Sequence, residues 1–238
     1  MKISSIFLLF SFLFILPNRV FADFVPTAYY QQDGEMMQTT DVLNDAQAPL
    51  HVTFKANPSS ADDVAEAFEW RFTKEGEASP FMVRYEQNTD YEFRESGTTT
   101  IALYVSYDKN QAPILISTIK ITISASLLEV PNAFSPNGDG INDVYKVKSN
   151  HKSIVEFHGY IFNRWGVKVY EWTDIDGGWD GTYKGTKVKN GVYFALIKAR
   201  GADGIEYNIK RDVNILTCLL YTSPSPRDVE ESRMPSSA

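Results

Sequence analysis

The stretch GVYFALIKARGADGIEYNIKRDVNIL, residues 191–216, decides the fold class of this chain. In its second half the odd positions from 205 to 215 are apolar except Arg211, and the even positions are polar. Alternation with period two is typical of a half-buried strand. The first half is apolar enough for a central strand, and Gly201-Ala202-Asp203-Gly204 can join the two as a hairpin loop. The stretch therefore predicts an antiparallel pair of strands.

The same alternation recurs upstream in several short runs. LHVTFKAN places Val52, Phe54 and Ala56 on one face. The other inward sets are Phe68, Trp70 and Phe72; Tyr91 and Phe93; Ile101, Leu103, Val105 and Tyr107; Ile119, Ile121 and Ile123. Short strands separated by turn residues at this spacing are typical of an immunoglobulin-like sandwich. The sequence thus predicts an all-β chain of two consecutive immunoglobulin-like β-sandwich domains.

Residues 1–22 have the features of a secretory signal peptide. Lys2 precedes a short apolar core, Ile6 to Leu16, and small residues lead to a predicted cleavage site after Ala22. An uncleaved anchor is the alternative, although the apolar run is short for a membrane span. No later segment has the length and hydropathy of a transmembrane helix, so none is expected in the mature chain.

Residues 217–238, TCLLYTSPSPRDVEESRMPSSA, do not continue the strand pattern. Codons for Cys218 to Asp228 and for Ser232 to Ala238 resemble the mosaic end and adapter of transposase-based sequencing libraries, which flank a variable index. We therefore expect this tail to be a translated adapter and disordered; a natural Ser/Pro tail is the alternative. The only cysteine, Cys218, lies in it, so we expect no disulfide or thiol chemistry in the rest of the chain.

The predicted organisation follows from these boundaries. The signal peptide covers 1–22, an extended lead-in with at most a first strand covers 23–48, and the first sandwich covers 49–126. The second sandwich covers 127–216, before the tail 217–238.

Charge and motif content limit the function classes. The chain carries a net charge of -7 and no basic stripe, which disfavours nucleic-acid binding. GxSxG, HExxH and P-loop patterns are missing from the sequence, and His51, His151 and His158 sit in different segments. We therefore expect no enzyme activity.

Four motifs in the second half resemble a known family. They are FSPNGDGINDVY (134–145), IFNRWGVKVYEW (161–172), GGWDGTYKG (177–185) and NGVYFALI (190–197). In this order they resemble the gliding motility-associated C-terminal domain, the type B sorting domain of the type IX secretion system. The resemblance implies recognition by the type IX machinery at the outer membrane of Gram-negative gliding bacteria. It also implies transport of a passenger from the periplasm to the cell surface or medium.

Residues 49–126 resemble a PKD-like or immunoglobulin-like module more generally. Phe68-Glu69-Trp70 and Tyr91-Glu92-Phe93, ahead of the strand from Gly97 to Val105, carry this likeness. Modules of this kind serve as spacers or as adhesive, sugar-binding or protein-binding units.

The loop SPNGDGIND is open to three interpretations. It can be a tight turn, because Gly accepts positive φ and Asn and Asp close turns with their side chains. It can be a calcium loop with oxygen ligands from Asn137, Asp139, Asn142 and Asp143, although the distal Glu of an EF-hand is absent. It can also be a recognition surface, which is compatible with either. Calcium is the only candidate cofactor.

The second hairpin supplies a further candidate recognition surface, Asn163, Arg164 and Asp180. Arg164 can pair with Asp180 or stack on an aromatic ring. Core and turn roles are expected for the neighbouring aromatic residues and glycines, which are Trp165, Gly166, Trp179, Gly181, Gly191 and Tyr193.

Together these features predict a secreted or cell-surface protein exported by type IX secretion, with an immunoglobulin-like passenger for adhesion or binding. Its expected partners are the secretion machinery and a surface polysaccharide or protein ligand. The alternative is a calcium-dependent carbohydrate- or matrix-binding protein.

Overall fold

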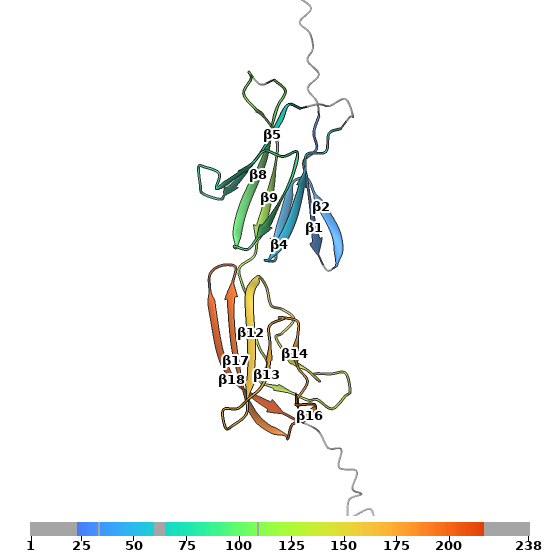
Figure 1. The fold of residues 1–238 in the computed structure, drawn as a ribbon, viewed down its shortest axis with the longest axis vertical. Helices are drawn as coiled ribbons and strands as arrows, with labels where there is room; N and C mark the ends of the chain where they lie inside the picture. The colour runs from blue at the N-terminus through green and yellow to red at the C-terminus, as the bar shows by residue number, and fades with distance from the viewer. Residues whose placement is uncertain (1–22, 33, 60–64, 109, 217–238) are drawn as a thin grey trace, which may run out of the picture.

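The computed structural model describes residues 23–32, 34–59, 65–108 and 110–216. These residues contain strands and no helix, so none of their segments is a helix that could cross a membrane. The prediction of an all-β chain is therefore confirmed. Figure 1 shows two β-rich halves arranged end to end along the long axis of the molecule.

The N-terminal half is a sandwich of two sheets (Figure 1). One sheet has the order β2-β1-β4-β7 and the other the order β3-β9-β8-β5-β6. The bounds are β1 Thr27–Gln32, β2 Glu35–Thr39, β3 Val42–Ala46, β4 Leu50–Lys55, β5 Ala67–Lys74, β6 Met82–Arg84, β7 Asn88–Phe93, β8 Gly97–Ser106 and β9 Ile114–Ile123.

The core of this half consists of the alternating side chains of facing strands. Val52 and Phe54 of β4, Trp70 and Phe72 of β5, and Ile101 of β8 are all fully buried. The Trp70 indole N–H donates to the Glu86 carbonyl oxygen at 3.1 Å, so this large side chain leaves no polar atom unpaired. Period-two alternation therefore builds this core.

Residues 23–48 differ from the predicted lead-in, because they form three strands. β1 pairs antiparallel with β2 and β4, and β3 pairs in parallel with β9. The hydrophobic pattern is weak here because β2 and β3 are largely exposed on both faces, so their side chains need not alternate between apolar and polar. These residues belong to the first sandwich.

The C-terminal half is built on one five-stranded sheet with the order β10-β18-β17-β12-β13. Two short ribbons, β11–β14 and β15–β16, supply the second layer. The bounds are β10 Ala133–Phe134, β11 Tyr145–Lys146, β12 Ile154–Phe162, β13 Lys168–Trp172, β14 Gly178–Trp179, β15 Thr182–Tyr183, β16 Thr186–Lys187, β17 Gly191–Gly201 and β18 Glu206–Ile215.

The hairpin predicted from residues 191–216 is the centre of this sheet. β17 and β18 pair antiparallel from Gly191↔Ile215 to Arg200↔Glu206. Val213 and Ile215 are buried, whereas Ile205, which was expected on the buried face, lies in the loop and is 51% exposed. Arg211 fits its apolar row because its guanidinium donates to the Val130 carbonyl oxygen at 2.8 Å.

The turn of this hairpin contacts the N-terminal half. Ala202 belongs to the hydrophobic cluster of that half, and its carbonyl oxygen accepts a hydrogen bond from the Ser96 N–H at 2.9 Å. Asp203 accepts hydrogen bonds from the Ser126 N–H at 2.8 Å and from the Ser126 hydroxyl at 2.7 Å. A Cβ at Gly201 would lie 2.2 Å from the Ser126 Oγ, so the close approach requires glycine.

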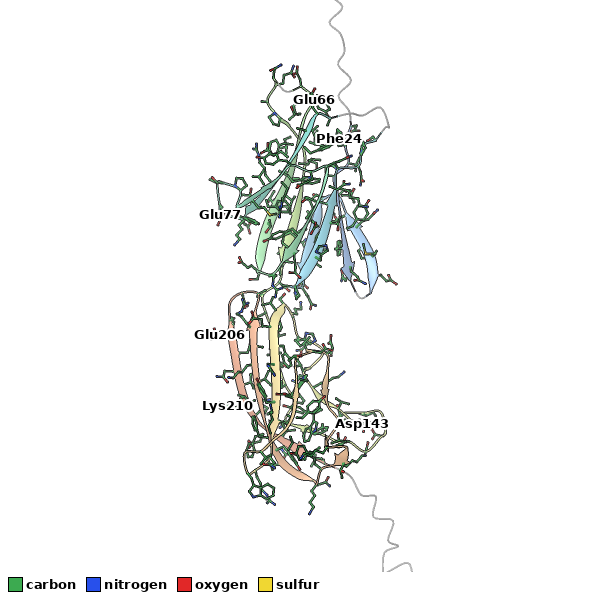
Figure 2. All side chains as sticks on the ribbon, in the orientation of Figure 1. Phe24, Glu66, Glu77, Asp143, Glu206 and Lys210 are labelled. Atoms are coloured by element: carbon green, nitrogen blue, oxygen red, sulfur yellow. The ribbon has the colours of Figure 1, made fainter. Side chains whose placement is uncertain are left out.

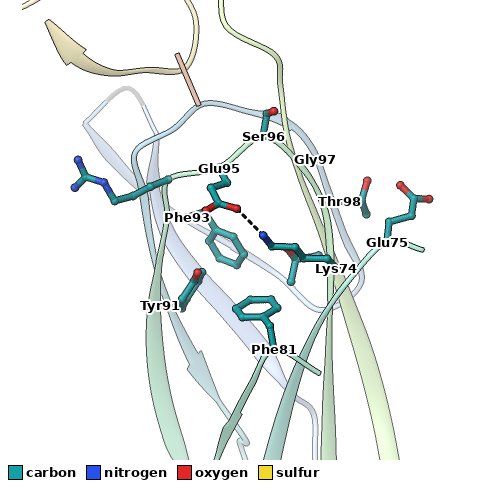
Figure 3. A pocket seen from close by; sticks show the side chains of 11 residues that line it. Lys74, Glu75, Phe81, Tyr91, Phe93, Glu95, Ser96, Gly97 and Thr98 are labelled. Carbon is teal, nitrogen blue, oxygen red and sulfur yellow. Dashed lines mark hydrogen bonds and ion pairs between the residues drawn. The ribbon is translucent and has the colours of Figure 1, made fainter. Parts of the chain in front are cut away.

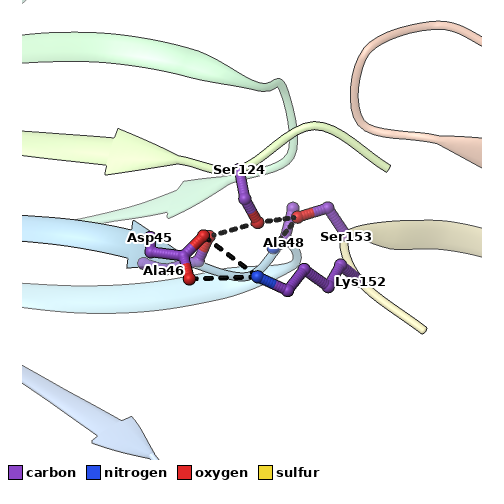
Figure 4. Close-up of polar contacts among 6 residues, drawn as sticks. All are labelled: Asp45, Ala46, Ala48, Ser124, Lys152 and Ser153. Atoms are coloured by element: carbon purple, nitrogen blue, oxygen red, sulfur yellow. Dashed lines mark hydrogen bonds and ion pairs between the residues drawn. The ribbon is translucent and has the colours of Figure 1, made fainter. Parts of the chain in front are cut away.

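A second cluster of polar contacts joins the halves near β3 and the start of β12 (Figure 4). Ser153, only 2% exposed, bonds through its hydroxyl to the Ser124 hydroxyl at 3.1 Å and accepts from the Ala48 N–H at 3.3 Å. The Lys152 ammonium lies 3.0 Å from an Asp45 carboxylate oxygen. Contacts on two sides of the linker, residues 124–127, therefore fix one half against the other.

We expect Asp203→Ala to loosen this junction. The change removes the acceptor of the Ser126 N–H and hydroxyl, and an unpaired polar group in such a contact costs about 1–3 kcal/mol. Urea denaturation should show a lower midpoint, and small-angle scattering should show a broader range of overall lengths.

Asp212→Ala is the matched control, because no hydrogen bond or ion pair of the described residues involves the Asp212 side chain on the same hairpin. Equal midpoints and equal scattering for Asp203→Ala and Asp212→Ala would contradict the role of Asp203 at the junction.

Candidate functional site

The loop between β10 and β11 is held by its own side chains. The Asp143 carboxylate accepts hydrogen bonds from the Gly138 N–H at 2.6 Å and from the Gly140 N–H at 2.7 Å. Asp139 accepts from the Ile141 N–H at 2.7 Å and from the Asn137 side-chain amide at 2.8 Å. Gly138 and Gly140 have positive φ values of 85° and 83°, as the tight-turn interpretation requires.

The carboxylate oxygens of Asp139 and Asp143, which are the predicted cation ligands, already accept hydrogen bonds within the loop. Hydrogen bonds from the Gly138 and Gly140 N–H groups hold the pKa of the Asp143 carboxyl below its usual value. In the part of the chain that the structure describes, no group of three or more His, Cys, Asp or Glu side chains is placed to hold a metal ion. The loop has the closed turn geometry of the first interpretation, and Asn142 also takes a positive φ of 54°.

The β12–β13 hairpin ends in a turn built around Asn163. Its side-chain oxygen accepts hydrogen bonds from the N–H groups of Trp165 and Val167, each at 3.0 Å. The Gly166 N–H donates to the Asn163 carbonyl oxygen at 2.9 Å, and Gly166 has a φ of 77°. Asn163 therefore acts as a turn-closing residue with its side chain turned toward the backbone.

Trp165 is exposed, which corrects the expectation that it is a core residue. Its relative exposure is 72%, the highest among the large apolar side chains of the described residues. The Arg164 guanidinium lies 4.4 Å from the centre of its ring, within the range of a cation–π contact. Of the two contacts predicted for Arg164, the structure shows the aromatic one.

Asp180 lies in another turn and has other partners. Its carboxylate accepts hydrogen bonds from the Thr182 N–H at 2.9 Å and from the Thr182 hydroxyl at 2.7 Å. No ion pair in the described ranges joins it to Arg164, so the predicted pairing of Arg164 with Asp180 is not observed.

Trp179 lies in the core beneath these loops. It is fully buried, its indole N–H donates to the Thr182 carbonyl oxygen at 2.7 Å, and its ring packs against Phe134 and Tyr193. Gly181 has a φ of 76°, and a Cβ there would lie 3.0 Å from the Pro136 ring. Burial raises the pKa of Tyr193, whose hydroxyl donates to the Lys189 carbonyl oxygen.

Beside the exposed Trp165 lies a hollow of about 540 Å³. The sequence predicts part of its wall but does not single out Lys189, Asn190, Val192 and Phe194, which lie just before and at the start of β17. Its lining residues are Asn163, Arg164, Trp165, Lys189, Asn190, Gly191, Val192, Tyr193 and Phe194. The sequence contains a signal for this surface. Val192 and Phe194 make the outer face of β17 apolar, although the inner face of the same strand is apolar as well.

A smaller hollow of about 270 Å³ lies in the N-terminal half, where β5 and β7 approach each other (Figure 3). Phe81, Tyr91 and Phe93 form an aromatic wall, and the Lys74 ammonium bonds to the Glu95 carboxylate at 2.5 Å. The Glu95 hydrogen bond raises the pKa of Lys74. Rings beside charged groups are common in pockets for small polar molecules. The sequence did not single out these residues as a group.

Residues 128–210 match the family model of the CHU_C Type IX secretion signal domain. The family resemblance carried by the four motifs is therefore confirmed for this part of the chain. The matched residues start directly after the linker and cover most of the C-terminal sheet, so a type IX secretion signal domain follows an upstream β-sandwich.

Comparison with solved structures includes a crystal structure of dimeric latent PorU from Porphyromonas gingivalis. It is 13% identical with a TM-score of 0.25, and the alignment covers 81% of this chain and 20% of that one. A comparison with curated proteins gives no match.

We expect Asp143→Asn to destabilise the protein at neutral pH and to make its stability depend less on pH in the acid range. Because the pKa of Asp143 is lower in the folded chain, its carboxylate stabilises the fold above the unfolded pKa of about 4. This contribution is lost as the pH falls through the folded value. Urea midpoints should therefore differ most near pH 7 and converge as the pH is lowered below about 4.

Asp212→Asn, which removes a charge without breaking a hydrogen bond of the described residues, is the control. A constant gap between Asp143→Asn and the parent chain at all pH values would contradict this account. Saturable heat from calcium that Asp143→Asn abolishes would instead support the calcium-loop interpretation.

Proposed function

We propose that this protein is cargo of the type IX secretion system, exported through its C-terminal domain to the cell surface or the medium. The observation that carries the proposal is the match of residues 128–210 to a type IX secretion signal domain. The predicted signal peptide, residues 1–22, lies outside the described residues and would supply the first step, from the cytoplasm to the periplasm.

The N-terminal sandwich is then the passenger, and we propose that it acts by binding rather than by catalysis. Support comes from the hollow beside Phe81 and Tyr91, whose aromatic wall and Lys74–Glu95 pair offer both apolar and charged contacts. A sugar unit or a peptide side chain is of suitable size and chemistry. An adhesive role at the surface of a gliding cell follows from this placement and from the family of the C-terminal domain.

The alternative remains a calcium-dependent carbohydrate- or matrix-binding protein in which export is secondary. It differs from the main proposal in one measurable respect, the effect of a chelator. Glycan-array signal that disappears with chelator would favour the alternative. Signal that chelator does not affect, and that the wild-type protein gives but Tyr91→Ala does not, would favour a calcium-independent passenger.

We expect export to depend on residues 127–216. The test compares the full chain, carrying an internal reporter, with a chain that ends at Ser126, each in a host with a type IX system and in a host lacking its translocon. The full chain should reach the medium or surface only in the first host, and the truncated chain should stay in the periplasm of both.

As a control, both reporters must be intact and equally abundant in the periplasm of the host that lacks the translocon. Export of the truncated chain, or export of the full chain without the translocon, would overturn the proposed function.

A further inference from the structure

The two ends of the C-terminal domain have different surroundings. β17 runs from Gly191 to Gly201 and β18 returns from Glu206, so the hairpin turn between them faces the passenger. β12 runs the opposite way from β17, which places the turn 163–167 and the start of β17 at the other end. In Figure 2, Glu206 lies near the passenger and Lys210 lies farther along β18. The far end is thus unobstructed by the passenger.

A surface at this far end combines exposed apolar side chains with two cations. We call it the distal patch and define it as Arg164, Trp165, Lys189, Val192 and Phe194. Trp165, Val192 and Phe194 are 72%, 47% and 42% exposed. Side chains this exposed contribute little to stability, and grouped apolar side chains on a surface are typical of interaction sites.

The turn holds Trp165 in the exposed position. Asn163 and Gly166 fix the backbone on both sides of it through the hydrogen bonds described above. Arg164 then covers one face of the indole ring. A side chain held in place in this way loses less conformational entropy on binding, so the patch is organised before a partner arrives.

The charges of the patch are also available. Neither Arg164 nor Lys189 forms an ion pair with a carboxylate in the part of the chain that the structure describes, where seven of the other Lys and Arg side chains do and the rest do not. The lining of the hollow beside the patch contains no acidic residue, and the nearest one along the sheet is Asp212, opposite Phe194. In a chain of net charge -7, this is a local positive site.

We propose that the distal patch docks onto a protein of the export machinery whose surface has an apolar recess bordered by carboxylates. The inference rests on the proposed function and adds the docking surface and the chemistry of its partner. Trp165 would fill the recess, and Arg164 and Lys189 would meet the bordering carboxylates. Aromatic and Arg residues are the usual anchors of such interfaces, and opposite charges guide the encounter.

Two other occupants fit less well. A second copy of this chain in a twofold dimer would place Arg164 and Lys189 against the same cations. An anionic polysaccharide would pair with the two cations. Its hydroxyl groups, however, would face Val192 and Phe194 on the sheet, and these side chains offer no hydrogen-bond partner.

The test measures export of the full chain with an internal reporter in the type IX host. Trp165→Ala and the pair Arg164→Glu with Lys189→Glu should each slow export about tenfold or more, as expected for an interface anchor. The conservative changes Trp165→Phe and Arg164→Lys should retain most of it. Tyr85→Ala, which removes an aromatic side chain that is 69% exposed on the passenger, and Lys210→Glu, which reverses a charge elsewhere on the sheet, are the controls and should export normally.

Urea midpoints of the purified variants separate docking from folding, because exposed side chains should change the midpoint little. Val192→Asp supplies a second, independent variant of the patch. Normal export of all patch variants, with the truncated chain still retained in the periplasm, would overturn this inference and leave the proposed function intact. Export of the truncated chain would overturn the proposed function itself.

The other occupants give different results. A wild-type dimer in size-exclusion chromatography that Trp165→Ala dissociates would assign the patch to a second copy. Binding to alginate, an anionic polysaccharide, that the double charge reversal abolishes while export stays normal would assign it to a glycan. Either result would overturn the inference.

Discussion

The hydrogen bonds between Asp203 and Ser126 are the central polar contact at the junction of the two halves of this protein. They join the turn of the β17–β18 hairpin to the linker, and the same turn places Ala202 against the core of the N-terminal half. Burial raises the pKa of Asp203, but the hydrogen bonds from Ser126 and from the backbone N–H groups of the turn together lower it below its usual value, which favours the charged carboxylate. The Tyr207 hydroxyl, 2.8 Å from the Ser126 hydroxyl, completes the cluster.

One consequence is that the C-terminal domain has one occupied end and one free end. The hairpin that forms the centre of its sheet also forms the contact with the passenger, so strand direction alone places the β12–β13 turn at the opposite end. A passenger of a different size attached at Ser126 would leave that end unchanged.

The sequence predicted the parts of the fold in which burial alternates along a strand. Val52, Phe54, Trp70 and Ile101 gave this signal because one face of each strand meets the core. β2 and β3 lacked it because they are edge strands with little burial on either face. Trp165 was assigned to the core from residue type alone, whereas the hydrogen bonds of Asn163 decide its position, and such bonds leave no periodic pattern.

The acidic composition of the chain has a structural explanation that also bears on the candidate site. Many Asp carboxylates accept backbone N–H groups within turns, including those of Asp108, Asp139, Asp143, Asp174, Asp180 and Asp203. Turns rich in Asp, Asn and Gly therefore arise from the need to close loops between many short strands.

The same residue types supply calcium ligands, so composition alone does not separate the two roles. In the loop 135–143 the hydrogen bonds show the turn-closing role, because the two oxygens of Asp143 each accept a glycine N–H. Cationic side chains follow no such rule, because seven of the Lys and Arg side chains in the described residues form ion pairs with carboxylates and the others do not. Arg164 and Lys189 are two of those without an ion pair, and they lie at the end of the C-terminal domain that points away from the N-terminal half, where a partner can reach them.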